Sequence, residues 1–529
     1  MGVPSYFNWL IQKYKTEAII ATKPTFKIEN LFLDLNCAIH PAVKADPNYT
    51  IDQMYQAIIV YIDNIVNFVN PSGIIYLAID GVAPLAKMNQ QRDRRYKTVL
   101  FNKEKSKIYE KYKKKEDKTI HDYNMISPAT DFMKNLSICL KKHYINKLKN
   151  YILSDASEPG EGEHKIFDYI RKNKIKNYVI YGLDADLIFL SLINLENTNC
   201  LLVRESNMIL NSMEINQKYL YLDINLLYTK LIEELQNTND PINNPINDHN
   251  IIIDYVFISF FLGNDFLPHI PSLSIKDGVL DILINIYKET NKITNKYLIN
   301  IKENYIINYE FMYHFLTKLS ENETDLLLNS LEIKTKRMNN MAKKMKYMSP
   351  FERELEELNY IEFKQPDIYI QYDKPDYNKR YNKYYFNNNK QIYTDYMYGL
   401  RWVLLYYLGL NKNWSWMYKW PMGPLINDLR NVYIKKMGEF NIKFIETEPI
   451  NPYLQLIYIL PYESINLLPA ELKIHLKQNL YFHILYPTNI KLDMVNKKYF
   501  NEAILHLPEI NLENLEYIFM PIIKLNLIK

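Results

Sequence analysis

The chain has 529 residues, of which 48% are hydrophobic and 23% charged, a composition typical of a globular protein with a large buried core. A net charge of +4 is too small to indicate a polyanionic partner. Three widely separated cysteines without CxxC spacing exclude a disulfide framework and a zinc site, and they favour a reducing compartment. The length suggests roughly two to four domains, or one large core with insertions.

The N-terminus carries no pattern for secretion or lipid attachment. Tyr6 stands where N-myristoylation requires Ser or Thr, and no signal-peptide layout is present. The longest strongly apolar run, residues 251–262, is too short to cross a bilayer and contains Asp254, so we predict a buried helix there. We therefore expect a soluble intracellular protein, cytoplasmic or nuclear, with no membrane partner.

An amphipathic helix is predicted over residues 5–14, and three apolar runs that each end in an aspartate follow it. The runs cover residues 31–34, 74–80 and 178–184, and they end in Asp34, Asp80 and Asp184. Continuous apolar runs separated by helical segments are typical of buried parallel strands, whose carboxyl ends meet at one edge of a sheet. We predict an α/β fold, a mainly parallel sheet with flanking helices, in which the three aspartates share this edge.

A basic helix face is predicted after the second of these strands. Lys87, Gln91, Arg94 and Arg95 fall at i, i+4, i+7 and i+8, which places them on one side of a helix. Guanidinium groups suit phosphate oxygens, so this face is a candidate pocket for a terminal phosphate. A solvated basic face explains the same spacing. The later run 103–118 mixes both signs of charge and is expected to be a solvated helix without a functional role.

Two glutamates precede the third predicted strand. Inside a helix, the i, i+2 spacing of Glu161 and Glu163 would point them about 200° apart, so both face one point only from a loop or a first turn. Pro159, Gly160 and Gly162 supply the irregular backbone that such a loop needs. A solvated helix start is the alternative, since acids are favoured there by unpaired N–H groups and the helix dipole.

Two further acids extend this set. Asp186 lies just past the third strand, and Asp265 follows the apolar run 251–262 in a Gly-Asn-Asp turn. A group of acids this dense repels itself unless cations hold it, so we infer a divalent metal. The alternatives are that the strand-end aspartates cap the following helices and that the Gly-Asn-Asp turn merely ends a helix.

A soft boundary near residue 285 divides the chain into a nuclease-like core, residues 1–285, and a mostly helical second region, residues 286–529, which packs on it. Upstream of the boundary, residues 236–250 read as a loop rich in Pro, Asn and Asp. Within the second region, the Tyr- and Asn-rich stretch 374–396 is expected to be a surface excursion.

Aromatic residues dominate the stretch after this excursion. Residues 396–410 are predicted to form a buried helix, and the loop after it carries Trp414 and Trp416. Exposed aromatic faces stack on unpaired bases, worth about 1 to 3 kcal/mol per base. Plain packing in the core is the alternative for both tryptophans. The rest of the tail is expected to pack back on the core.

Long motifs along the chain resemble those of the XRN family of 5′→3′ exoribonucleases. They read MGVPSYFNWL, LFLDLNCAIH, IDGVAPLAKMNQQRDRRYK, SDASEPGEGEHKIFDYIR, GLDADLIFLSL, LGNDFLPHIPSLSI and GLRWVLLYYLGLNKNWSWMYKWP. The similarity covers most of the chain and is weaker through residues 290–395. Family members continue well beyond the nuclease and helical regions, so we expect this chain to comprise the catalytic core without the longer C-terminal extensions.

The resemblance implies a PIN/flap-nuclease-like core and a metal-dependent enzyme that removes nucleotides from single-stranded RNA with a 5′ monophosphate. It implies two ions, Mg²⁺ or Mn²⁺, held by Asp34, Asp80, Glu161, Glu163, Asp184, Asp186 and Asp265. It implies a 5′-phosphate pocket at Lys87, Gln91, Arg94 and Arg95. It implies that the first base is sandwiched between His40 and either Trp414 or Trp416.

Two other functions remain as alternatives. A flap or structure-specific nuclease uses a similar acidic cluster but usually continues from its last Asp into a Gly-h-Gly hairpin, whereas Asp265 is followed by FLPHIPSLSIKDG. A non-catalytic RNA-binding protein on the same fold would be expected to have lost some of the acids, and this chain keeps all seven.

Overall fold

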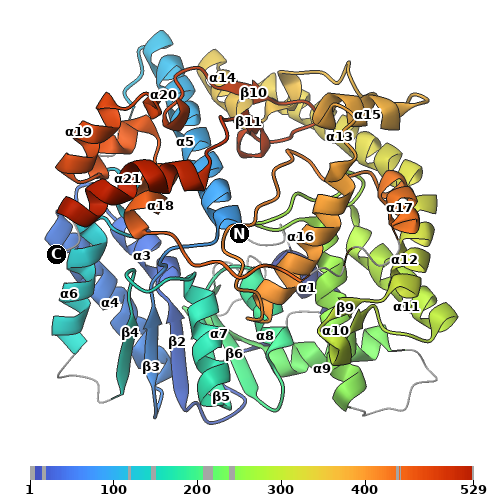
Figure 1. Cartoon of the computed structure of the whole chain (residues 1–529), viewed down its shortest axis with the longest axis horizontal. Coiled ribbons are helices and arrows are strands. Elements are labelled where there is room, and N and C mark those ends of the chain that lie inside the picture. Colours follow the sequence, from blue (N-terminus) through green and yellow to red (C-terminus); the bar gives the residue numbers. More distant parts are fainter. Residues whose placement is uncertain are drawn as a thin grey trace.

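A seven-stranded sheet lies at the centre of the N-terminal half (Figure 1). The computed structural model describes residues 6–14, 19–116, 121–144, 150–206, 218–236, 245–436, 440 and 443–526. The strands, in spatial order, are β1 (Ile20–Ala21), β7 (Tyr219–Asp223), β6 (Asn199–Glu205), β5 (Asn177–Tyr181), β2 (Asn30–Asp34), β3 (Ile75–Ala78) and β4 (Tyr151–Ser154). The five strands from β6 to β4 are parallel, and β7 runs antiparallel to β6 and β1. The predicted mainly parallel sheet is therefore confirmed.

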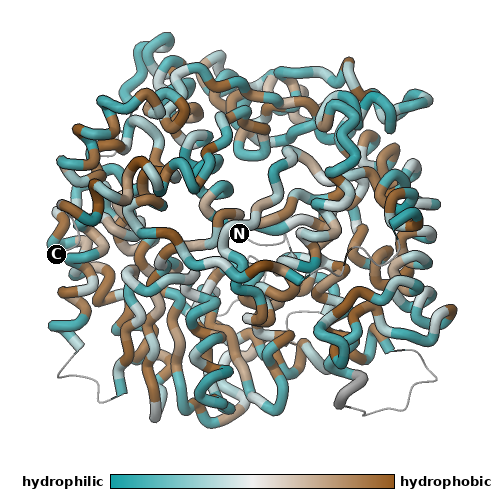
Figure 2. The backbone as a smooth tube through the Cα atoms, in the orientation of Figure 1, coloured by the Kyte–Doolittle hydropathy of each residue, from teal (hydrophilic) through white to brown (hydrophobic). Residues whose placement is uncertain are grey.

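Successive residues of each strand face opposite sides of this sheet, as a pleated strand requires. Phe32 and Ile180 pack on one side, and Leu31, Leu33 and Val179 pack on the other. The first side is covered by α7 (Gly162–Asn173), α8 (Asp186–Ile193), α9 (Ile224–Leu235) and α10 (Pro245–Ser259), and the second by α3 (Asn36–Val43), α4 (Ile51–Val69) and α6 (Asp131–Tyr144). Both faces are thus buried, which explains why the strands are nearly continuous apolar runs (Figure 2).

The strand order reverses between β2 and β5. The chain builds β2, β3 and β4 outward in one direction, and β5 and β6 then lie on the other side of β2. In open α/β sheets, ligands bind beyond the carboxyl ends of the strands at such a switch point. Asp34 is the last residue of β2 and Asp184 follows β5, so two of the predicted acids flank this point.

The predicted buried helix over 251–262 is formed by α10 and a 3-10 turn, Phe260–Leu262. Its acid, Asp254, is fully buried and accepts hydrogen bonds from the backbone N–H groups of Leu298 and Ile299, at 2.7 and 2.8 Å, and from the hydroxyl of Tyr287 at 2.9 Å. Of the loop predicted over 236–250, residues 237–244 lie outside the described residues, and residues from 245 on are helical.

The second region is mostly helical, as predicted. It comprises α11 (Val279–Thr294), α12 (Tyr309–Glu321), α13 (Glu323–Met345), α14 (Pro350–Asn359), α15 (Tyr377–Phe386), α16 (Gln391–Tyr407), α17 (Ile426–Lys435) and the short strands β8 (Ile299–Asn300) and β9 (Ile306–Ile307). The boundary near residue 285 stays a prediction; that residue lies inside α11, and one hydrophobic core joins residues on both sides of it.

The stretch 374–396 is not a surface excursion. It forms α15 and the start of α16, and the side chains of Tyr381, Tyr385 and Phe386 are buried. The Tyr381 hydroxyl donates a hydrogen bond to the carbonyl of Gly423 at 2.7 Å. Tyrosine carries a large apolar ring and a polar tip, so a Tyr-rich segment can be core when its hydroxyls find partners.

The longest helix of the described chain, α5 (Leu85–Lys111), follows β3 and extends for about 40 Å. The C-terminal elements pack against its first turns, where Leu85 and Met88 join their hydrophobic cluster. These elements are α18 (Pro452–Ile459), α19 (Ala470–Gln478), α20 (Phe482–Leu485) and α21 (Leu512–Asn526). The strands β10 (Lys491–Asp493) and β11 (Ile504–His506) form a separate pair, and Leu492 of β10 packs in another cluster with Leu100 and Phe101 further along α5. The far end of α5, predicted as a solvated helix, rests on α14, where Tyr109 and Tyr112 pack edge-on against Phe351.

The N-terminal helix α1 (Tyr6–Tyr14) packs in the hydrophobic core on the side of the sheet that α8 and α10 cover. Ser5, which begins the predicted helix, is outside the described residues. The Trp9 indole donates a hydrogen bond to Asp281 on α11 at 3.2 Å, so the first residues of the chain are held by the helix that contains the predicted boundary. Across the described ranges, we find no helix with the length and apolar character of a membrane span.

We predict that Asp254→Ala lowers the free energy of unfolding by about 3 kcal/mol, because it leaves two buried N–H groups and one hydroxyl without an acceptor. Urea denaturation measures the loss. Asp248→Ala on the same helix removes a single hydrogen bond to Gln236 and should cost less than about 1 kcal/mol. Equal losses in the two variants would contradict this account of the buried acid.

Candidate active site

Carboxylates from three neighbouring strands converge at the carboxyl edge of the sheet. Oxygen atoms of Asp34, Asp80 and Glu163 lie within 4.8 Å of one another, and Asp34 and Asp184 form a second such group with the Cys37 thiol. Asp34 is buried, whereas Asp184 is exposed. The predicted gathering of strand-end acids is therefore present, and the N-cap residues of the helices that follow are Leu35, Pro84 and Ala185, not these aspartates.

The loop before α7 brings both of its glutamates to this edge. Glu161 is the N-cap residue of α7 and is only 3% exposed, and Glu163 lies in the first turn. Between them, the backbone N–H of Gly162 donates to Asp80 Oδ1 at 2.7 Å, and a Cβ atom at this position would lie 2.9 Å from Asp34 Oδ1. Glycine is thus required for the close approach, and the alternative of a solvated helix start is wrong for Glu161.

Lys87 joins the acids to the basic helix. From the first turn of α5, its ammonium lies 2.5 Å from Glu161 Oε2 and 2.7 Å from Asp265 Oδ2. The Tyr406 hydroxyl on α16 donates to the other oxygen of Glu161 at 2.9 Å. One cation therefore connects a loop of the sheet, the long helix and the turn after α10, and the second region contributes a donor to the same carboxylate.

The remaining acid, Asp186, is the first residue of α8 and is buried. Burial, followed by the negative charge of Asp265, raises the pKa of Asp186 to about 7. Burial, followed by the charge of Asp80, likewise raises the pKa of Asp34 to about 7. Burial and neighbouring carboxylates also raise the pKa of Glu163 well above its usual range.

These shifts describe a site with too little positive charge, because the few nearby cations, chiefly Lys87, do not balance the buried carboxylates. Asp265 shows the contrast: burial would raise its pKa, but the ammonium of Lys87 brings that pKa below its ordinary value. Clustered carboxylate oxygens are the ligands that hard divalent cations prefer. The acidic cluster, which we define as the seven predicted acids, therefore fits a divalent metal.

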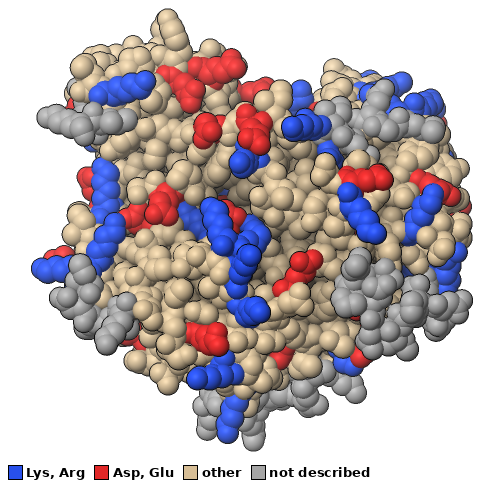
Figure 3. Space-filling view, turned by 60° about the horizontal axis from the view of Figure 1, so that its bottom comes forward, with Lys and Arg blue, Asp and Glu red and all other residues tan. Residues whose placement is uncertain are grey.

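The basic face predicted on α5 lies beside this cluster. Arg95 donates to Ser127 Oγ at 2.7 Å through Nη2, while among the described residues its buried Nη1 finds no partner, nor does Oε1 of Gln91. Arg94 is exposed. Figure 3 shows Lys and Arg side chains gathered beside a hollow near the middle of one face of the molecule. Unused buried donors and acceptors of this kind indicate a polar ligand.

His40 lies on α3, the helix that follows β2. Its pKa is lowered to about 4, first by burial and then by the positive charges of Lys44, Arg94 and Arg95. The ring is therefore neutral at pH 7, and it feels the charges of the basic face of α5. A neutral imidazole presents a flat ring that can stack on a base without adding a positive charge beside the basic face.

The two tryptophans left open by the sequence have different surroundings. Trp416 stacks on Trp402 of α16, with 4.9 Å between ring centroids, and its indole lies over Gly399. No ring within the described ranges packs against Trp414. Its carbonyl accepts a hydrogen bond from the N–H of Leu85 at 2.8 Å, which fixes its loop to the start of α5. Packing thus accounts for Trp416, whereas Trp414, which is partly exposed, stacks on no ring of the described residues.

Sequence reasoning missed several contacts of the acidic cluster. The Asn36 side chain donates to Asp80, and the Cys37 thiol donates to Asp34 at 3.1 Å. Lys165 is 7% exposed and donates to the carbonyls of Ile79 and Asp155, both at 2.8 Å. Asn36 and Cys37 lie two and three residues after Asp34, and this closeness in the sequence could have indicated their contacts with the acids. Lys165 shares α7 with Glu163 but carried no pattern of its own.

Comparison with known proteins finds two family models that match this chain. Residues 1–206 match the XRN 5′-3′ exonuclease N-terminus, and residues 245–366 and 371–521 match the Xrn1 helical domain. The chain is 28% identical to the 5′-3′ exoribonuclease 2 of Yarrowia lipolytica over 97% of its length and 68% of the relative, and 28% identical to the Drosophila melanogaster homolog over 98% and 71%. It is 34% identical to the Gallus gallus protein, 5′-3′ exoribonuclease 2, over 56% of its length, and spans only 40% of that relative.

Metal binding should appear in the thermal stability of the protein. Because Asp34 and Asp186 have pKa values raised from 3.8 to about 7, the folded protein binds protons that the unfolded chain releases, so metal-free stability falls as pH rises through this window. Metal ions relieve the same repulsion, and protons compete with them. We therefore predict that Mg²⁺ raises Tm more at pH 8 than at pH 6, as measured by differential scanning calorimetry.

Glu163→Gln provides the matched test. Removing one repelling charge should stabilise the metal-free protein at pH 8 by about 1 to 3 kcal/mol and abolish the Mg²⁺-dependent rise in Tm. Asp168→Asn, an exposed acid on the same helix, should leave both properties unchanged. A Mg²⁺ effect that is equal at the two pH values, or that survives Glu163→Gln, would overturn the assignment of a metal to this cluster.

Proposed function

Because the chain belongs to the XRN family of 5′-3′ exonucleases, we propose that it is a metal-dependent 5′→3′ exoribonuclease acting on single-stranded RNA with a 5′ monophosphate. The single observation that carries this proposal is the contact of Lys87 with Glu161 and Asp265, which sets a basic helix face directly beside an acidic cluster. A terminal phosphate bound on that face would place the first phosphodiester bond of the RNA next to the acids, whose metal ions would promote its hydrolysis.

The acidic cluster would hold two divalent cations, Mg²⁺ or Mn²⁺. When bound, such ions supply an activated water and stabilise the leaving oxygen of an in-line displacement. The protein fixes the ligands: Gly162 N–H holds Asp80, Asn36 also donates to Asp80, and Cys37 holds Asp34. Preset ligands of this kind need no rearrangement when the metal enters, which favours tight and specific coordination.

The basic face would select the RNA end. Arg95 has one nitrogen held by Ser127 and a second, buried, that lacks a partner among the described residues, so a phosphate oxygen would complete its hydrogen bonding. Charge-assisted bonds from guanidinium to phosphate are strong and directional. A cap or a triphosphate adds bulk and charge at the same point, and we expect both to bind poorly.

The first base would stack between His40 and Trp414. The neutral ring of His40 lies near the charges of Arg94 and Arg95, and the loop of Trp414 is bonded to the start of α5. Stacking tolerates any base, which suits an enzyme that degrades RNA of any sequence. The names of the relatives and the presence of all seven acids favour this proposal over a flap-type nuclease or a non-catalytic RNA-binding protein.

Digestion of RNAs that differ only at the 5′ end tests the proposal. With Mg²⁺, the wild-type protein should degrade 5′-monophosphate RNA at least tenfold faster than triphosphate or capped RNA, and Asp184→Ala/Asp186→Ala should lose activity. Arg95→Met should slow the monophosphate substrate and narrow its advantage over 5′-hydroxyl RNA, because the buried phosphate ligand is lost. Equal digestion of all ends, or activity in the double aspartate variant, would refute it.

The tryptophans give a second, independent test. Trp414→Ala should raise KM for single-stranded RNA about 5- to 100-fold, as loss of one stacking partner implies, with little change in Tm. Trp416→Ala should instead lower Tm, because it removes a ring packed on Trp402 and leaves a cavity. Steady-state kinetics and calorimetry measure the two effects. The reverse pattern would show that Trp416, not Trp414, is the stacking residue.

A further inference from the structure

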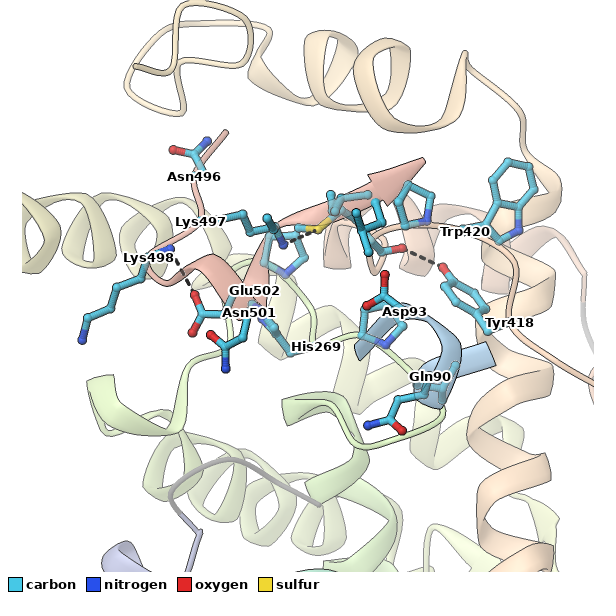
Figure 4. Close-up of a pocket in the computed structure, with 18 of the residues that line it drawn as sticks. Gln90, Asp93, His269, Tyr418, Trp420, Asn496, Lys497, Lys498, Asn501 and Glu502 are labelled. Carbon is cyan, nitrogen blue, oxygen red and sulfur yellow. Dashed lines mark hydrogen bonds between the residues drawn. The ribbon is translucent and has the colours of Figure 1, made fainter. Parts of the chain in front are cut away.

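A cavity with a volume of about 1100 Å³ lies along another side of α5 than the one that carries Lys87, Gln91 and Arg95. It is enclosed by the first half of α5, the segment after Asp265, the loop 417–422 and the C-terminal segment 496–510. Figure 4 shows Gln90 and Asp93 of α5 on one wall, Tyr418 and Trp420 on another, and the segment from Asn496 to Glu502 across from them.

Helical spacing separates this cavity from the basic face of α5. Gln90, Asp93 and Lys97 line it and follow one another at i, i+3 and i+7, a stripe rotated by about 120° from that of Lys87, Gln91 and Arg95. The two surfaces meet at Asp265, which both lines the cavity and pairs with Lys87. The acidic cluster and the cavity wall therefore share one residue, Asp265.

One lysine of the cavity wall, Lys497, could bind an anion. The ammonium of Lys497 contacts only a thioether, Met422 Sδ at 3.0 Å, and forms no ion pair with a carboxylate among the described residues. The neighbouring Glu502 accepts hydrogen bonds from the backbone N–H groups of Lys498 and Tyr499. Burial lowers the pKa of Lys497 to about 8, so an anionic ligand would stabilise its charged form.

Two other acids of the wall are paired, whereas Asp277 and Glu509, which also line it, form no ion pair among the described residues. Asp93 pairs with Lys97 at 2.6 Å, and Glu362 accepts two bonds from Arg337. Two more lysines, Lys276 and Lys498, lie over the faces of the Tyr499 ring, at 5.8 and 4.5 Å from its centroid. They form no ion pair in the described part of the chain. Lys276, Lys497 and Lys498 therefore bring three ammonium groups to this end of the cavity, where Glu502 also lies.

Size and aromatic content narrow the ligand class. Pockets for small ligands usually have volumes of about 300 to 1000 Å³. This cavity, at about 1100 Å³, is large enough for one nucleotide and its bound water. Tyr418 and Trp420 line the same space, and aromatic rings stack on bases without regard to sequence. Lysine ammonium groups for a phosphate, aromatic rings for a base and space for one nucleotide together fit a nucleoside monophosphate.

We propose that this cavity, centred on Lys497, binds the nucleoside 5′-monophosphate released at the acidic cluster and forms the exit compartment for that product. The proposal rests on the proposed function, which supplies a 5′-monophosphate at each step. Release into a compartment on another side of α5 leaves the basic face free for the next 5′ phosphate. The RNA can then advance without waiting for the product to leave by the entry path.

The test is a titration of AMP into protein whose RNA site is already filled. Wild-type protein is first saturated with a 5′-phosphorylated, phosphorothioate RNA oligonucleotide that resists hydrolysis, and AMP binding is then measured by isothermal titration calorimetry. We expect AMP to bind this complex, adenosine to bind at least tenfold more weakly, and Lys497→Met to weaken AMP about tenfold without changing the affinity for the oligonucleotide.

Three further variants make the result specific. Lys276→Met, which alters an exposed residue of the wall, should weaken AMP by about two- to threefold. Arg95→Met should weaken the oligonucleotide but not AMP in the filled complex. Lys383→Met, which makes the same charge change at an exposed position of α15, should change neither affinity. An unchanged oligonucleotide affinity also shows that Lys497→Met is folded.

The possible outcomes separate this proposal from the proposed function. If AMP cannot bind the filled complex, or if Lys497→Met leaves its affinity unchanged, the exit compartment is refuted even when RNA digestion proceeds as expected. If AMP binds through Lys497 but the protein does not degrade RNA, the nucleotide site stands and the exoribonuclease function fails. Added AMP should also inhibit digestion, with an inhibition constant about tenfold higher in Lys497→Met.

Discussion

Repulsion among carboxylates at the carboxyl edge of the sheet is the constraint around which this molecule is built. Parallel strands must end on the same side, so Asp34, Asp80 and Asp184 arrive together, and the loop with Gly162 adds Glu161 and Glu163 at close range. Burial and mutual charge then raise the pKa values of Asp34 and Glu163. A fold retains such a destabilised group when the group performs chemistry.

Lys87 shows how the protein connects this edge to its other parts. Its ammonium links Glu161 to Asp265, and Tyr406 of α16 reaches Glu161 from the second region. The buried contacts of Arg92 with the carbonyl of Pro508, at 2.8 Å, fix the C-terminal segment to the same helix. The basic face and the cavity therefore lie on two sides of one helix, and Lys87 of that helix contacts the acidic cluster.

Much of this arrangement follows from local sequence. Apolar runs ending in aspartate predicted the parallel sheet and its acidic edge, and helical spacing predicted the basic face, because strand and helix periods fix the side on which a residue lies. The choice between Trp414 and Trp416 depends on the position of Trp402, which no local pattern specifies. The prediction of a surface excursion at residues 374–396 was wrong for a related reason. Its tyrosines suggest a polar segment by composition, but the Tyr381 hydroxyl has a hydrogen-bond partner in the core.

The cavity on the second side of α5 could not be predicted from the sequence, since Gln90, Asp265, Tyr418 and Lys497 meet there from distant parts of the chain.

The most direct test of the whole account is a crystal structure with Mn²⁺ and an uncleavable 5′-phosphorylated RNA. We expect anomalous peaks from Mn²⁺ between Asp34, Asp80 and Glu163, and the terminal phosphate on Nη1 of Arg95. Manganese bound elsewhere, or a 5′ phosphate away from α5, would contradict it.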